Sequence, residues 1–307
     1  MRLFWVLISG LFFSSCSQGK QSQNMDNSKH DGKTKDSTIQ VKSDAYKPQL
    51  GSCAFPLISD IIQGVNGTYS CDFYKKSYKF YLQNPQNNRG KLLVLFPGWN
   101  YPVMDWKHNT GVVDSALQWG FQVLLCDMGK SVYMDSVYPE ARGDYKGFAT
   151  RTWLWDSVLS PVSKQIGMGN MVLMGLSTGA RGAILLGMEH QNEVGGVIAL
   201  SGDYVPTLDT TDALMRNSMG PFYNNPKRWE EGDNNIYNID GLPNFVFIAH
   251  GEKDKIVPIQ HSRCLNEHLG FLKTTETLIF REEQGAHDYQ FWGKWGMVGL
   301  RSAISEQ

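Results

Sequence analysis

Three residues of the chain have the types and the order that nucleophilic catalysis by a serine requires. Ser177 lies in Gly175-Leu176-Ser177-Thr178-Gly179, Asp254 follows an apolar run at 245–249, and His287 follows another at 277–280. A serine hydroxyl becomes a useful nucleophile when an imidazole takes its proton, and a carboxylate can orient that imidazole. The order of serine, acid and histidine, each placed after a strand, indicates acyl-transfer chemistry.

The stretch around Ser177 predicts a strand, a tight turn and a helix. Residues 171–174 are apolar, and small or apolar residues recur at helical spacing from Ala180 to Met188. In this context Gly-x-Ser-x-Gly holds its serine in strained backbone geometry. A side chain at Gly175 or Gly179 would collide with the strand or the helix. The alternative is a glycine-rich turn that contains a serine incidentally.

Two aspartates compete for the role of the acid. Asp254 lies in a polar loop before Val257-Pro258, which leads into a predicted helix, whereas Asp203 directly follows the predicted strand at 195–201. We favour Asp254, because Val257-Pro258 would carry the chain away and leave the carboxylate facing the histidine loop. Asp203 is the alternative acid. His250 is predicted to pack in the loop rather than to act as the base.

The segments around these residues alternate between strands and helices. Continuous apolar runs are typical of strands buried on both faces of a mainly parallel sheet, and they occur at 91–96, 121–126, 171–174, 195–201, 245–249 and 277–280. The Tyr- and Phe-rich residues 67–83 predict antiparallel edge strands. We therefore expect one α/β catalytic domain over 50–307, with a doubly wound, mainly parallel sheet.

Two connecting segments are predicted to lie around the site. Residues 202–242 show little periodicity, apart from patterns typical of short helices at 211–219 and 226–231. A connection of this length predicts a cap over the site, and a surface insertion is the alternative. The polar loop at 127–150, with Tyr133, Tyr138 and Tyr145, is predicted to border the cleft.

These motifs together resemble the α/β-hydrolase superfamily, from about residue 91 to the C-terminus. The ending Ala286-His287-Asp288-Tyr289-Gln290-Phe291-Trp292 resembles the esterase-D and feruloyl-esterase-like branch. The resemblance implies that Ser177 is the nucleophile, His287 the base and Asp254 its orienting acid. It implies a serine esterase that cleaves a small-molecule or acyl-glycan ester through an acyl-enzyme and needs no cofactor. A peptidase or acyltransferase with the same triad, and a catalytically silent binding lipoprotein, are the alternatives.

The resemblance also implies an oxyanion hole made of two backbone N–H groups. Thr178 would supply one at the start of the helix after Ser177, where the helix dipole favours negative charge. Trp99 would supply the other from Pro97-Gly98-Trp99-Asn100, which follows the strand at 91–96. Proline stands here where such loops commonly have histidine, so this loop departs from the family pattern.

The N-terminal residues predict export and a lipid anchor. Residues 1–16 combine Arg2, an apolar run from Leu3 to Phe13, and Ser14-Ser15-Cys16. The run is too short to span a membrane, which takes about 20 apolar residues, and it is typical of a signal peptide. Small residues before Cys16 resemble a bacterial lipobox, so we expect lipidation of Cys16 and a place in the bacterial cell envelope. An ordinary signal peptide is the alternative.

Composition limits the remaining possibilities. Residues 17–49 are polar and predict a flexible tether. The net charge of −1 gives no electrostatic reason to expect nucleic acid as a partner, and a membrane is expected to be contacted through the lipid anchor only. No cluster of cysteines and histidines predicts a metal site. Cys53 and Cys71 would form a disulfide after export.

Overall fold

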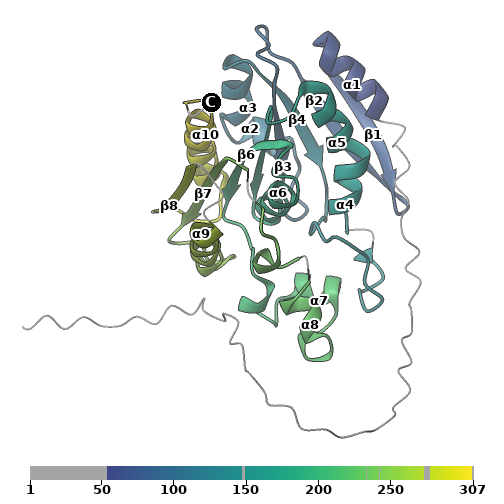
Figure 1. The fold of residues 1–307 in the computed structure, drawn as a ribbon, viewed down its shortest axis with the longest axis vertical. Coiled ribbons are helices and arrows are strands. Elements are labelled where there is room, and N and C mark those ends of the chain that lie inside the picture. The colour runs from purple at the N-terminus through teal and green to yellow at the C-terminus, as the bar shows by residue number, and fades with distance from the viewer. Residues whose placement is uncertain (1–53, 147–148, 233, 242, 273–276, 306–307) are drawn as a thin grey trace, which may run out of the picture. The chain divides into compact units, whose positions relative to one another are not determined.

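The computed structural model describes residues 54–146, 149–232, 234–241, 243–272 and 277–305. Its centre is an eight-stranded sheet with the order β1-β2-β4-β3-β5-β6-β7-β8 (Figure 1). The pairs β1–β2 and β2–β4 are antiparallel, and all other neighbours are parallel. The strands are β1 Gly67–Phe73, β2 Lys76–Gln83, β3 Lys91–Phe96, β4 Phe121–Asp127, β5 Met171–Leu176, β6 Val194–Leu200, β7 Phe245–Gly251 and β8 Thr277–Glu283.

Helices cover both faces of this sheet. Helices α3 and α10 pack on one face through a shared apolar cluster, and α6 packs on β5 and β6 from the other. The helices are α1 Ala54–Gln63, α2 Asp105–His108, α3 Val112–Gln118, α4 Arg151–Leu154, α5 Ser160–Ile166, α6 Thr178–Glu189, α7 Ala213–Met219, α8 Pro226–Glu230, α9 Gln260–Leu272 and α10 Tyr289–Ser305. The predicted doubly wound α/β fold is confirmed.

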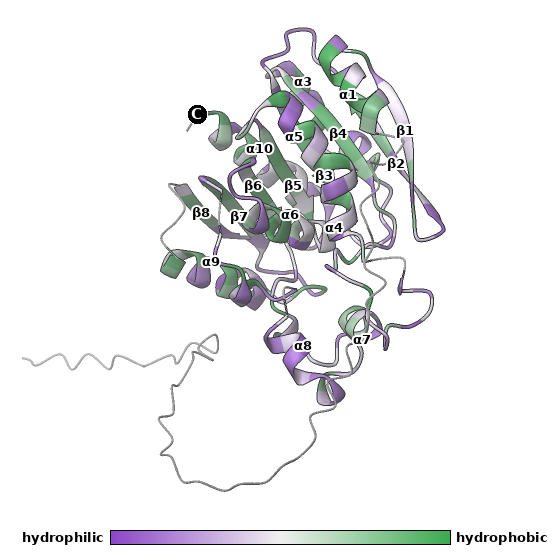
Figure 2. Cartoon of the chain, turned by 45° about the vertical axis from the view of Figure 1, so that its right-hand side comes forward, coloured by the Kyte–Doolittle hydropathy of each residue, from purple (hydrophilic) through white to green (hydrophobic). Residues whose placement is uncertain are grey.

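Burial on both faces explains the sequence pattern of the central strands. Every residue of β5 and β7 is buried, as are all residues of β3 except Lys91. A strand that is covered on both faces has no polar side, so its sequence is a continuous apolar run. Figure 2 shows these strands as the hydrophobic centre of the molecule. β1 and β2 instead alternate between buried and exposed residues, as expected at an edge with one covered face.

The region between β4 and β5 departs from one expectation drawn from sequence. It ends in a continuous helical stretch, in which α4 runs into α5 through a single π-helical turn at Trp155–Leu159. Pro161 stands at the start of α5, where its missing N–H costs little. Tyr133 does not border the cleft. It is buried against Phe96, in space that Gly182 leaves open.

The segment after β6 holds short helical elements rather than strands. It contains α7 and α8 together with single 3₁₀ turns at Pro206–Leu208, Phe222–Asn224 and Ile236–Asn238. Trp229, Met215 and Met219 of this segment share a small apolar cluster with Val132 and Met134, which lie between β4 and α4. The two short helices expected in this segment are present at nearly the expected positions.

The predictions for the N-terminal region concern residues that the structure does not describe. The signal peptide, Cys16, the tether at 17–49 and Cys53 all lie outside the described residues. Cys71 is disulfide-bonded, but its pairing with Cys53 stays a prediction. None of the described helices combines the length and apolar character that crossing a membrane requires.

Candidate active site

Ser177 stands in the turn between β5 and α6 with a backbone conformation that few residues adopt. Its φ is 53° and its ψ is −127°, a region in which most non-glycine residues are strained. A Cβ on Gly175 would come 2.1 Å from the Gly179 carbonyl oxygen, and one on Gly179 would come 2.4 Å from the Pro97 carbonyl oxygen. The two glycines are therefore needed because three backbone segments meet at this serine.

Asp254 holds the imidazole of His287. The Asp254 Oδ2 atom lies 2.6 Å from His287 Nδ1, while its Oδ1 accepts the backbone N–H groups of Ile256 and Val257 at 2.8 and 2.9 Å. Burial alone would raise the pKa of Asp254, but hydrogen bonds from His250, His287 and the Val257 backbone hold that pKa well below its usual value. An ionised Asp254 fixes the proton of His287 on Nδ1 and leaves Nε2 as an acceptor.

His250 has a supporting role that its sequence position did not indicate. Its Nε2 lies 3.0 Å from the Val257 carbonyl oxygen and 3.4 Å from Asp254 Oδ2, and its Nδ1 lies 2.7 Å from Ser262 Oγ. A carbonyl and a carboxylate can only accept, so Nε2 carries a proton. His250 is fully buried, and its Nε2 approaches the same carboxylate oxygen of Asp254, Oδ2, that His287 Nδ1 contacts.

The terminal helix fixes the other side of His287. The ring of Trp292 in α10 meets the His287 ring edge to face, with centroids 4.8 Å apart. The Trp292 indole N–H donates to Ser201 Oγ over 3.1 Å, and Ser201 directly follows β6. The imidazole is thus held by a carboxylate and by a tryptophan that is itself bonded to the sheet.

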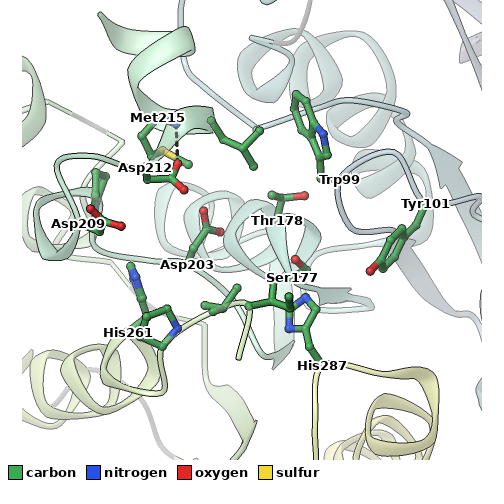
Figure 3. A pocket seen from close by; sticks show the side chains of 15 residues that line it. Trp99, Tyr101, Ser177, Thr178, Asp203, Asp209, Asp212, Met215, His261 and His287 are labelled. Atoms are coloured by element: carbon green, nitrogen blue, oxygen red, sulfur yellow. Dashed lines mark hydrogen bonds between the residues drawn. The ribbon is translucent and has the colours of Figure 1, made fainter. Parts of the chain in front are cut away.

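One cavity of about 310 Å³ joins the predicted residues. Ser177, His287, Trp99, Thr178 and Asp203 all line it, and Figure 3 shows the side chains of Ser177 and His287 next to each other in its wall. Asp254 lies behind His287 rather than in the wall. A Cβ on Gly98 would come 3.1 Å from Ser177 Cβ, so the loop that carries Trp99 passes directly beside the serine.

Asp203, the alternative acid, lines the same cavity but has a different environment. Its Oδ1 is buried and has no hydrogen-bond partner among the described residues. Burial raises the pKa of Asp203 to about 6, against the opposing effect of Arg181. The structure therefore brings Asp254, not Asp203, into hydrogen-bond contact with the imidazole.

Buried Arg181, four residues after Ser177 in α6, connects the two ends of the segment after β6. Its guanidinium donates to the Asp203 carbonyl oxygen over 2.8 Å and also to the Asn234 carbonyl oxygen. Asn234 in turn bonds to Arg151, Asp135 and Tyr138. Neither Arg181 nor Asn234 stood out in the sequence, because a buried arginine in an apolar helix has no local signature.

Comparisons with known proteins agree with this architecture. No known family profile matches the chain. An acetyl esterase from Caldicellulosiruptor saccharolyticus is 24% identical over 222 residues, which cover 67% of this chain and 80% of that protein. Two similar solved structures are an S-formylglutathione hydrolase from Agrobacterium tumefaciens (TM-score 0.62, 13% identity, 79% of this chain and 95% of that one) and the fluorophosphonate-binding serine hydrolase FphF from Staphylococcus aureus (TM-score 0.60, 13% identity, 78% and 98%). The chain has the α/β-hydrolase fold.

Within this α/β-hydrolase fold, the described part of the chain contains no group of three or more His, Cys, Asp or Glu side chains that could hold a metal ion. Cys126 is a buried free thiol near the end of β4. Side chains of the cavity wall that can act as nucleophile, acid or base include Ser177, two imidazoles and three carboxylates.

The close backbone contacts at the Ser177 turn predict that alanine substitutions at Gly175 and Gly270 change the free energy of unfolding very differently. Gly175→Ala should lower the free energy of unfolding by about 1–3 kcal/mol or more, because the new methyl group meets backbone atoms that cannot move independently. Gly270→Ala is the matched control, since nothing lies within 4 Å of a Cβ there and alanine favours the helix α9 by about 0.5–1 kcal/mol. Urea denaturation of both variants measures this. If the two variants had equal free energies of unfolding, the close packing at the Ser177 turn would be contradicted.

Proposed function

We propose that this protein is a serine hydrolase that cleaves carboxylic esters with Ser177, His287 and Asp254. The observation that carries the proposal is the 2.6 Å contact between Asp254 and His287 Nδ1 beside a cavity that His287 shares with Ser177. This contact leaves Nε2 of the imidazole to take a proton at the cavity. The strained turn supplies a hydroxyl within the same wall.

In the first half-reaction, Ser177 Oγ attacks the ester carbonyl carbon while His287 Nε2 takes the hydroxyl proton. The imidazolium that forms is stabilised by the ionised carboxylate of Asp254. His287 then returns the proton to the oxygen of the leaving alcohol as the carbon–oxygen bond breaks. The products of this step are the alcohol and an acyl group on Ser177.

The negative charge that develops on the carbonyl oxygen needs donors in fixed positions. Thr178 is the first residue of α6, so its N–H lies at the positive end of the helix. The loop with Trp99 runs beside Ser177, and its N–H is the second proposed donor. Donors of this kind contribute roughly 3–4 kcal/mol each to stabilisation of the transition state.

In the second half-reaction, water attacks the acyl-enzyme while His287 again acts as the base, and the acid is released. No step of this sequence uses a cofactor. The acetyl esterase among the relatives and the hydrolase fold support a carboxylic ester as the substrate. A small-molecule ester or an acyl group on a glycan both fit this chemistry. A peptidase or acyltransferase would use the same residues, and a substrate panel separates these activities.

Ser177→Ala should abolish labelling by a fluorophosphonate and reduce ester hydrolysis by at least about 10³-fold, because the nucleophile is lost. Labelling is read by gel fluorescence and by mass spectrometry of the labelled peptide, and turnover is measured with an aryl acetate. Ser70→Ala, at an exposed position of β1, is the control and should keep both signals. Labelling that persists in Ser177→Ala would contradict the assigned nucleophile.

The two candidate acids are separated by matched amide substitutions. Asp254→Asn should lower kcat by about 10⁴-fold, because the amide favours the wrong imidazole tautomer. Asp203→Asn should cause a much smaller loss on a short uncharged ester, since that side chain does not contact His287. Circular dichroism checks that both variants fold. A severe loss in Asp203→Asn with near-normal Asp254→Asn would reverse the assignment.

We also propose that the catalytic domain is carried as a lipoprotein, on the basis of the apolar run that ends at Cys16. Expressed in a bacterial host, the full chain should partition into membranes with acyl chains on Cys16. Cys16→Ser should become soluble or stay unprocessed. Mass spectrometry of the N-terminal peptide tests this, and cleavage elsewhere without lipid would show an ordinary signal peptide.

A further inference from the structure

The catalytic cavity has an acidic end that the ester chemistry itself does not use. Asp203, Asp209 and Asp212 line it together with Ser177. Figure 3 shows the three carboxylates on the side of the cavity away from Tyr101, with Asp203 between Ser177 and the other two. No lysine or arginine is among the described residues that line the cavity.

Asp209 and Asp212 are held in place by bonds that leave one oxygen of each carboxylate unused. Asp209 Oδ1 accepts the backbone N–H and the hydroxyl of Thr211 at 2.9 and 2.6 Å, and these hydrogen bonds lower the pKa of Asp209. Asp212 Oδ1 accepts the Met215 N–H at 2.8 Å at the start of α7. These three bonds all go to Oδ1, so the second oxygen of each carboxylate takes no part in them.

Two buried polar atoms of the cavity wall make no hydrogen bond within the described part of the chain. Oδ1 of Asp203 has no hydrogen-bond partner among the described residues, and neither has Oγ1 of Thr178, whose residue is only 3% exposed. Leaving a buried polar atom unpaired costs roughly 1–3 kcal/mol. Unpaired polar atoms in a cavity wall next to Ser177 are therefore available to a group of a bound ligand.

The positive groups nearby do not cancel the charge of this end. Arg181 lies behind Asp203 and donates to its backbone carbonyl oxygen, so it offsets one of three carboxylates. His261 also lines the cavity, but its Nδ1 accepts the Val205 N–H at 3.2 Å. Burial, together with nearby Arg181, lowers the pKa of His261 to about 3, so this ring is neutral. An excess of negative charge remains at neutral pH.

We propose that the acidic end selects esters that carry a hydrogen-bond-donating group without negative charge, either an ammonium group or hydroxyls, beyond the scissile bond. The inference rests on the proposed ester hydrolysis at Ser177. Ionised carboxylates only accept hydrogen bonds, so the matching ligand group must donate. An anionic group in the same place would be repelled by these charges, which solvent screens least at Asp203, whose Oδ1 is buried, and more at Asp209, which is exposed.

The test uses four acetate esters of one chain length, whose alcohol parts end in ammonium, hydroxyl, methyl or carboxylate. For the unmodified enzyme, kcat/KM of the ammonium and hydroxyl esters should exceed that of the methyl ester by about tenfold or more, as expected of charge-assisted hydrogen bonds. The carboxylate ester should be the poorest. Whichever of the ammonium and hydroxyl esters has the higher kcat/KM identifies the donor group that the acidic end binds.

Matched variants connect this preference to the carboxylates. The double variant Asp209→Asn with Asp212→Asn keeps an oxygen acceptor for Thr211 and for Met215, so α7 keeps its cap. It should reduce the preference for ammonium over carboxylate by about tenfold or more. Asp114→Asn removes the same charge at an exposed position of α3, outside the cavity lining, and should leave the preference unchanged. If the unmodified enzyme, the double variant and Asp114→Asn all showed the same preference for the ammonium over the carboxylate ester, the inference would be overturned.

A second measurement does not depend on turnover. The alcohols released from the ammonium and hydroxyl esters should slow fluorophosphonate labelling of Ser177 more than the methyl and carboxylate alcohols do. If labelling and hydrolysis occur but the methyl or carboxylate compounds are preferred, the acidic-end inference fails and the proposed function stands. If neither labelling nor hydrolysis of any ester occurs, both fail.

Discussion

The site depends on the contact of three backbone segments at Ser177. Gly175 lies near the end of β5, Gly179 lies in the first turn of α6, and the Pro97 carbonyl oxygen, just after β3, lies 2.4 Å from where a Cβ on Gly179 would be. A side chain on either glycine would meet backbone atoms, and the serine between them has a positive φ. The energy of the buried sheet therefore maintains a conformation that the local sequence alone would not keep.

The buried carboxylate of Asp254 is also held in place by the groups around it. Asp254 has two backbone N–H donors on one oxygen and two histidines near the other. Charge-assisted bonds of this number offset the cost of removing the ion from water. Because His250 and Ser262 bond each other behind it, the carboxylate is fixed before any substrate arrives. The imidazole of His287 is thus oriented by packing and electrostatics together.

The sequence could predict those elements of the fold and site that are specified by a few consecutive residues. The turn at Ser177, the strands around it, and the loops with Asp254 and His287 each have a short signature. Helix α1 and the acidic end of the cavity have no such short signature. Asp212 lies within the helix predicted at 211–219, but that it and Asp209 line one cavity depends on the packing of the whole segment. Tyr133 was misplaced for the same reason, since the space left by a distant Gly182 decides its burial.

The single guanidinium of Arg181 bonds to both ends of the segment between Asp203 and Asn234. Because both ends are bonded to the helix that follows Ser177, the segment joins the rest of the domain at two fixed points. The entropy of closing a loop between fixed points grows only slowly with the length of the loop. A change in the length of this segment should therefore cost little chain entropy, and the apolar cluster that Trp229 forms with Val132 and Met134 is what such a change has to preserve.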